Sequence, residues 1–183
     1  MSDDLLVQCC APTLAGIKTG NLFSCPIASR EELAADLRAL NRELSPSGLR
    51  ILPLRISRGQ ALLYLFRPAR LQQDLRDRDA RRILDDAGYR GLKPEQCILR
   101  LMKRLRSGEG FPHEIGLFLS YPPEDVRGFI DNKAQNYKFI GYWKVYGDES
   151  TARRTFSQYR NCTDAYRRSL QAGYGLSRLA VAI

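Results

Sequence analysis

The segment from Ser29 to Leu44, SREELAADLRALNREL, limits most tightly how this chain can fold. Ser29 and Glu32 form a capping-box pattern, in which both side chains bond to backbone N–H groups at a helix start. Leucines then recur every three or four residues, which is the period of one helix face. The segment therefore predicts an amphipathic helix that must bury its leucine face against another element.

Two apolar segments follow this helix and are separated by a short polar turn. Residues 49–57 read LRILPLRIS and residues 61–67 read ALLYLFR, with RGQ between them. This pattern predicts an antiparallel hairpin. Since proline cannot donate a hydrogen bond to a strand ladder, Pro53 places the first strand at a sheet edge or at a bulge.

The segments before and after this region are mostly helical in pattern. Residues 2–11 predict a first helix, capped by Ser2 and stopped by Pro12, and residues 13–26 predict an ordered loop or a short irregular strand. Three more helices are expected between Pro68 and Gly108, the second of them closed by Gly88.

The remainder alternates between strand and helix patterns. Strands are expected at 113–121, 136–146 and 176–183, and helices at 122–132 and 149–175. Links of this length allow parallel crossovers. The sequence thus predicts an α/β (or α+β) fold. It would be a single domain over residues 1–183, with a mixed sheet of about five strands: an N-terminal antiparallel hairpin plus a C-terminal β-α-β-α-β unit.

Composition narrows the class of protein. A length of 183 residues suits one domain. No apolar run approaches the roughly 20 residues of a membrane span, and the N-terminus lacks the basic region of a signal peptide. We therefore expect a cytoplasmic protein without a membrane partner. Five cysteines without a CxxC pair, and a single histidine, predict reduced thiols and no metal site. No nucleotide-binding glycine motif occurs, so the cofactor is left open.

The net charge of +9 favours an anionic partner. Residues 67–106 hold twelve Lys or Arg against six Asp or Glu, a local net charge of 12 − 6 = +6. An acidic protein, weak nucleic-acid binding or a solvated basic face would each explain this surplus.

His113 is the only histidine and Glu114 follows it directly. On an extended chain their side chains diverge, so a catalytic His113 would need another acid, with Asp125 or Asp148 as candidates. A strand over 113–121 would separate His113 from Tyr121 by roughly 25 Å. This separation favours a structural His113, bonded to a backbone carbonyl or to a carboxylate.

Three functions are compatible with these patterns. The first is a binding or regulatory domain for an unknown small molecule or acidic protein, with a pocket of His113 and aromatic residues. The second is an enzyme of thiol or acyl transfer, in which Cys or Lys works with His113. The third is weak nucleic-acid binding through residues 67–106. The binding candidates are Tyr121, Trp143, Lys144 and Tyr146, and the catalytic candidates are Cys10, Lys18, His113 and Glu114.

Four stretches resemble a bacterial family of unknown function from clostridia-type anaerobes. They are CAPTLAGIK (10–18), LLYLFRP (62–68), FPHEIGLFLSYPPEDVRGFI (111–130) and GYWKVY (141–146). The family pattern has glycine where this chain has Ser120. The resemblance implies a cytoplasmic domain in an anaerobe and brings no activity. It marks the eight candidate residues above as motif members without assigning roles.

Overall fold

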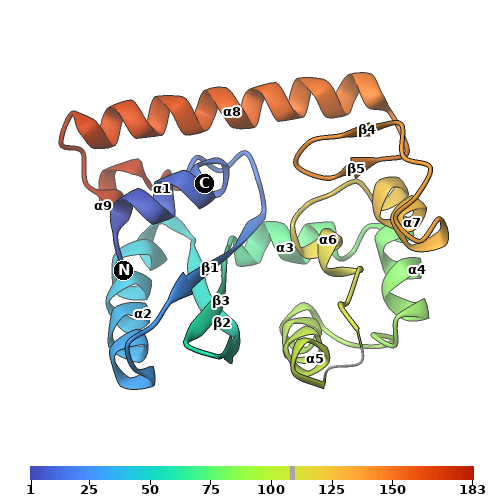
Figure 1. Cartoon of the computed structure of the whole chain (residues 1–183), viewed down its shortest axis with the longest axis horizontal. Coiled ribbons are helices and arrows are strands. Elements are labelled where there is room, and N and C mark those ends of the chain that lie inside the picture. Colours follow the sequence, from blue (N-terminus) through green and yellow to red (C-terminus); the bar gives the residue numbers. More distant parts are fainter. Residues whose placement is uncertain (108–109) are drawn as a thin grey trace. The chain divides into compact units, whose positions relative to one another are not determined.

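The computed structural model describes residues 1–107 and 110–183, which form two compact units (Figure 1). Unit 1 comprises Met1–Ala69 and Tyr159–Ile183, and unit 2 comprises Arg70–Gln158. The single domain over residues 1–183 that the length of the chain suggests stays a prediction.

Unit 1 contains a three-stranded antiparallel sheet in the order β1-β3-β2. The sheet is formed by β1 (Gly20–Pro26), β2 (Arg50–Ser57) and β3 (Gln60–Phe66). Its helices are α1 (Asp3–Leu14), α2 (Arg30–Leu44), the short η1 (Ser45–Ser47), the second half of α8 (Glu149–Gln171) and α9 (Leu176–Leu179).

The predicted first and second helices are confirmed, with one correction. Ser2 and Ser29 accept hydrogen bonds from the N–H groups of Leu5 and Glu32, as expected of helix caps. Pro12, however, does not stop α1, which runs to Leu14. Proline removes one hydrogen bond to the preceding turn, but the following residues extend the helix because their N–H groups still find acceptors in it.

The predicted hairpin is confirmed as β2 and β3. β2 lies at a sheet edge, and its pairing with β3 shifts register between Pro53 and Arg55. Both features were expected from a proline that cannot donate to a ladder. Arg58 and Gly59 form the turn with positive φ angles of 50° and 71°, which suit the right-handed twist of a tight hairpin.

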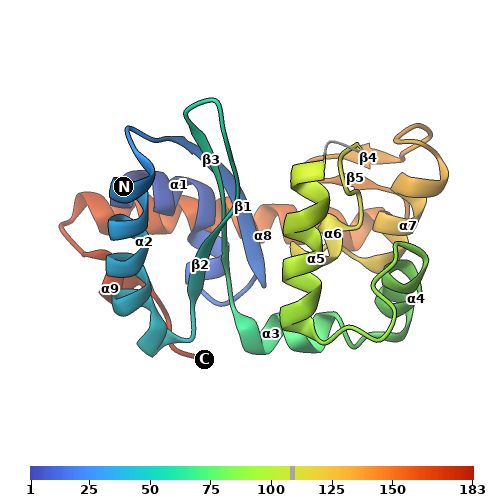
Figure 2. The same ribbon diagram turned by 90° about the horizontal axis from the view of Figure 1, so that it is seen from below.

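The core of unit 1 lies between the helices and one face of the sheet. α1 and α2 pack on the face that carries Ala61, Leu63 and Leu65 (Figure 2). The leucine face of α2 is buried there, as its spacing predicted. On the opposite face of β3 the rings of Tyr64 and Phe66 stack with centroids 4.6 Å apart. Both faces of β3 are therefore buried.

A buried arginine ties together the ends of several elements of unit 1. Arg67 is 1% exposed. Its guanidinium donates to the backbone carbonyls of Thr13 and Leu14 at the end of α1, Ser47 in η1 and Val181 near the C-terminus, at 2.7–2.9 Å. Helix C-termini carry unpaired carbonyls and a partial negative charge, so they stabilise a buried cation.

We expect Arg67→Lys to lower the free energy of unfolding by about 2–4 kcal/mol. A lysine ammonium cannot reproduce the planar fork that reaches four carbonyls, and it leaves buried acceptors unsatisfied. Urea denaturation measures the change. Arg50→Lys, an exposed arginine of β2, is the control and should change stability by less than about 0.5 kcal/mol. Equal effects of the two variants would contradict this role.

Unit 2 is mainly helical. It contains α3 (Pro68–Asp74, which begins in unit 1), α4 (Arg78–Asp86), α5 (Pro94–Ser107), α6 (Ile115–Phe118), α7 (Pro123–Asp131) and the first half of α8. A two-stranded antiparallel sheet joins β4 (Phe139–Ile140) to β5 (Lys144–Val145). The three predicted helices between Pro68 and Gly108 are confirmed as α3, α4 and α5, although Gly108 lies outside the described residues.

The predicted strand over 113–121 is wrong. Ile115–Phe118 forms a helical turn, and Ser120 has a positive φ of 55° that turns the chain so that Tyr121 N–H donates to the carbonyl of Gly116. An apolar run of this length does not distinguish a buried strand from a buried helical turn. Since the turn is compact, the expected separation of roughly 25 Å between His113 and Tyr121 loses its basis.

The predicted strands at 136–146 and 176–183 are also wrong. The first folds back on itself as β4 and β5, with Gly141 in the connection. The second begins with the short α9, whose Leu176 and Leu179 are buried at helical spacing. Among the described residues, the strands form two separate antiparallel sheets in place of the predicted C-terminal β-α-β-α-β unit and single mixed sheet. The mixed helix and strand class is confirmed, in its α+β form with two antiparallel sheets.

We expect Gly116→Ala to lower the free energy of unfolding by about 1–3 kcal/mol, the usual effect of overpacking. A Cβ at Gly116 would lie 2.8 Å from Cγ2 of Val126 and 3.0 Å from Cδ2 of Tyr121. Gly175→Ala is the control, because no atom lies within 4 Å of its added Cβ and its φ is −70°. Thermal unfolding of both variants checks the difference, and a neutral Gly116→Ala would refute close packing there.

Candidate functional site

A cavity of about 200 Å³ in unit 2 opens beside His113. Its apolar wall comes from α4, the residue after it, and α7: Ile83, Ala87 and Ile130. Phe111 and His113, from the segment that precedes α6, complete the wall. The charged lining residues are Asp86, Arg104, Glu114 and Arg127.

Glu114 is fixed inside the protein. Its side chain is 3% exposed, and Oε1 accepts hydrogen bonds from the Tyr89 hydroxyl at 2.7 Å and from the Arg104 guanidinium. Burial, followed by the neighbouring Glu114 carboxylate, raises the pKa of Tyr89 far above its usual range, so the phenol stays a donor. Glu114 thus stabilises the base of the cavity and is already paired.

The second charge pair of the cavity is held loosely. Nη2 of Arg127 on α7 donates to Oδ2 of Asp86 at the end of α4, at 2.8 Å. The Arg127 side chain is 37% exposed and that of Asp86 is 66% exposed. Exposed pairs of this kind contribute little stability and are readily exchanged for another partner.

His113 and Glu114 diverge as expected, since His113 is exposed and Glu114 is buried. The imidazole ring lies 4.9 Å from the ring of Phe129 and 6.2 Å from that of Phe111, which is 51% exposed. A structural role through a bond to a carbonyl or carboxylate stays a prediction. Because the His113 ring is exposed, we expect its removal to lower the free energy of unfolding less than removal of a buried histidine would.

Three of the predicted binding residues lie in one cluster of unit 2. The rings of Tyr121 and Trp143 stack with centroids 4.8 Å apart, and Trp143 packs edge-on against Phe156 at 4.5 Å. The Tyr146 hydroxyl is buried. The indole N–H of Trp143 and the backbone N–H of Tyr146 both donate to Asp125, and this shared acceptor joins Tyr146 to the other two residues.

Asp125 holds this cluster in place, a role that the sequence did not predict. Oδ2 accepts from Nε1 of Trp143 at 2.6 Å, and Oδ1 accepts from the N–H groups of Tyr146 and Gly147 at 2.7 Å. Asp125 is 3% exposed, so these bonds replace its hydration. Asp125 lies in the first turn of α7, but no pattern in the sequence indicates its donors, which lie 18 to 22 residues further along the chain.

The fourth predicted binding residue, Lys144, points its ammonium at the chain itself. Nζ donates to the carbonyl of Ala134 at 2.8 Å and lies 4.6 Å from the centroid of the Tyr137 ring. Asp148, the other proposed partner of His113, instead bonds the hydroxyl and N–H of Thr151 at the start of α8. These contacts lower the pKa of Asp148.

Cys10 and Lys18 belong to unit 1, where both are buried and influence each other electrostatically. Burial raises the pKa of the Cys10 thiol well above its usual range, and Cys9 raises it further, whereas Lys18 acts in the opposite direction. Burial lowers the pKa of Lys18 to about 8. At neutral pH the Cys10 thiol is therefore protonated, and it is a poor nucleophile in that form.

We expect Lys18→Met to raise the free energy of unfolding at pH 7, by up to about 3 kcal/mol for this pKa shift. In the unfolded chain Lys18 keeps its usual pKa of 10.5. The unfolded chain therefore binds more protons between pH 8 and 10.5, and the stability contributed at this position rises with pH through that window. The gain from Lys18→Met should then shrink towards pH 10.5.

Urea denaturation between pH 7 and 10 measures this difference, with the exposed Lys93→Met as control. A Lys18→Met effect that does not change with pH would contradict a lowered pKa.

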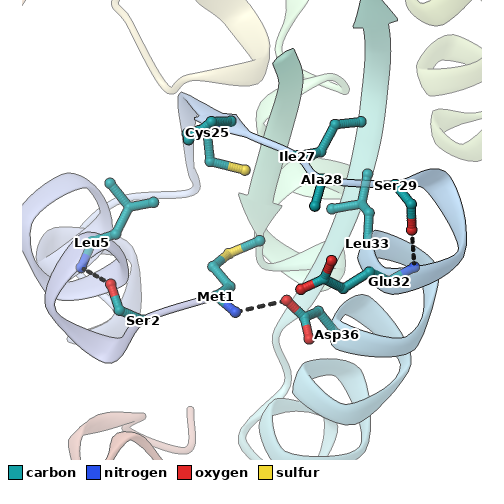
Figure 3. A pocket seen from close by; sticks show the side chains of 11 residues that line it. Met1, Ser2, Leu5, Cys25, Ile27, Ala28, Ser29, Glu32, Leu33 and Asp36 are labelled. Carbon is teal, nitrogen blue, oxygen red and sulfur yellow. Dashed lines mark hydrogen bonds and ion pairs between the residues drawn. The ribbon is translucent and has the colours of Figure 1, made fainter. Parts of the chain in front are cut away.

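A second cavity, of about 270 Å³, lies in unit 1 between the starts of α1 and α2 and the end of β1 (Figure 3). The Met1 ammonium donates to Oδ2 of Asp36 at 2.6 Å. Cys25 also lines it, and burial raises the pKa of this thiol. The carboxylate of Asp36 is thus paired within the chain, and the thiol is not activated.

Part of the basic surplus in residues 67–106 is used inside the protein. Arg67 bonds backbone carbonyls, Arg81 donates to the carbonyls of Tyr89 and Leu92, and Arg104 pairs with Glu114. The guanidinium groups of these three residues are already paired within the protein, which makes them less available to phosphates. The local charge therefore supports nucleic-acid binding less than the composition suggested.

The model of one protein family matches residues 6–180 of the chain. The chain belongs to the DUF3793 family. This family is described as a protein of unknown function, so the resemblance to a family without assigned activity is confirmed. Neither the curated proteins nor the solved structures contain a match to the chain.

DUF3793 membership supplies no catalytic or binding role for the eight candidate residues. Within the described residues, every helix is too short or too polar to cross a lipid bilayer. A cytoplasmic location, an anaerobic bacterial source and reduced cysteines stay predictions for this DUF3793 chain.

Proposed function

We propose that this chain is a binding domain for a small molecule, and that the cavity beside His113 is its site. The observation that carries the proposal is the exposure of Phe111. This aromatic side chain is 51% exposed and lines a cavity together with the apolar side chains of Ile83, Ala87 and Ile130. Exposed aromatic side chains with adjacent apolar surface are typical of binding sites.

The contacts around the cavity support this choice of site. Ile83 and Ile130 offer apolar contact, while His113 and Arg127 bring polar groups to the same cavity. Ligand sites commonly combine a largely apolar lining with a few polar groups that orient the ligand. Tyr121 and Trp143, by contrast, stack on each other, and Asp125 occupies the indole N–H. In this proposal they hold the shape of unit 2.

Filling the cavity tests the proposal. Single-ring fragments, benzoate and benzamide, are titrated into protein with ¹³C-labelled isoleucine methyl groups. We expect shifts at Ile83 and Ile130 and none at Ile51 in the core of unit 1. Ala87→Leu should abolish these shifts, because the larger side chain occupies the cavity.

Ala172→Leu is the matched control, since Ala172 directly follows α8 as Ala87 directly follows α4, and it is exposed. Circular dichroism is used to check that both variants are folded. Fragments that fail to shift Ile83 and Ile130, or shifts that persist in Ala87→Leu, would overturn the proposed site.

A further inference from the structure

We propose that the ligand of this cavity carries a planar anion, and that Asp86 takes the place of that anion on Arg127 when no ligand is bound. This inference rests on the proposed function, because it names the chemical class of ligand for the same site. The Arg127–Asp86 pair is itself a guanidinium–carboxylate contact with an Nη2–Oδ2 distance of 2.8 Å. A ligand carboxylate would form the same kind of contact.

The two charge pairs of the cavity differ in how easily they separate. Glu114 is 3% exposed and accepts from both Tyr89 and Arg104. Displacing it would leave a buried carboxylate without its cation, which is strongly unfavourable. Asp86 is 66% exposed, so it can return to water with little loss. The exchangeable pair is therefore Arg127–Asp86.

Exposure also decides which member of that pair stays. The side chain of Arg127 is less exposed than that of Asp86, at 37% against 66%. When Asp86 swings into solvent, Arg127 remains at the cavity, and the Arg104–Glu114 pair beside it stays neutral overall. The vacated site then carries one positive charge. The His113 imidazole, which lines the same cavity, can add a hydrogen bond to an anion there.

Size and lining set the rest of the ligand. A volume of about 200 Å³ is below the range of about 300–1,000 Å³ that accommodates drug-sized molecules. Ile83, Ile130 and Phe111 offer apolar surface to one ring or a short chain. A small aromatic or branched carboxylate combines both requirements, with its apolar part on this wall and its carboxylate on Arg127.

The experiment compares benzoate, benzamide and benzylamine, which share one ring and differ in charge. Affinities are measured from isoleucine methyl shifts at low ionic strength, where exposed charges are least screened. We expect benzoate to bind best. Asp86→Asn should raise benzoate affinity about 1.5- to 5-fold, because it removes the competing carboxylate, and leave benzamide unchanged.

Arg127→Gln should lower benzoate affinity at least about tenfold and leave benzamide unchanged, since a charge-assisted hydrogen bond is lost. The matched controls are Glu95→Gln and Arg90→Gln, exposed residues of unit 2 outside the cavity lining, which should change neither affinity. They show how much of each effect comes from net charge alone.

The outcomes separate this inference from the proposed function. Equal binding of benzoate and benzamide at Ile83 and Ile130 would keep the site and overturn the anion. Preference for benzylamine, weakened by Asp86→Asn, would instead assign the exchangeable charge to Asp86 and also overturn it. Absence of binding by all three fragments would overturn the proposed function itself. A higher benzoate affinity in Asp86→Asn, with none in Glu95→Gln, supports the inference.

Discussion

The fold of unit 1 depends on a cation that is buried on backbone carbonyls. Arg67 follows β3 directly, so its guanidinium is carried to the ends of α1 and η1 and to the chain near Val181. Removing a charge from water is unfavourable unless hydrogen bonds replace its hydration. Carbonyls at helix ends need donors for the same reason. Arg67 therefore keeps its own charge hydrogen-bonded and supplies donors to carbonyls at the helix ends. If the elements that it joins moved apart, both the guanidinium and these carbonyls would lose their hydrogen bonds.

Unit 2 uses the opposite charge in the same way. Asp125 accepts from the indole of Trp143 and from two backbone N–H groups of the segment after β5. Glu114 likewise accepts from Tyr89 and Arg104. Both carboxylates are buried and satisfied, so they stabilise the aromatic cluster and the base of the cavity. Asp86 and Arg127 differ from them because both are exposed at the cavity. Exchange with a ligand is possible where the charges remain hydrated, which is why we place recognition there.

Local patterns predicted those elements that are decided locally. The capping serines, the leucine face of α2, the hairpin with its edge proline and the long α8 all agree with the sequence. The errors fall on short apolar runs. Ile115–Phe118 became a helical turn because Gly116 allows Val126 and Tyr121 to pack closely, and no pattern within the run indicates that contact. Of the site, the sequence indicated His113 and Glu114 but neither Asp86 nor Arg127. Their pairing joins residues 41 positions apart on two helices.

The sequence by itself determined the class of secondary structure, the membership of a family of unknown function and the unusual character of the segment around His113. These depend on composition, short-range spacing and motif similarity. Only the tertiary structure decided which charges are buried and paired, and which remain exposed. Arg67, Arg104 and Arg127 are alike in the sequence, yet one joins helix ends, one neutralises Glu114 and one is held by an exposed carboxylate. Burial and the identity of the partner set the free energy of a charge, and both are properties of the folded chain.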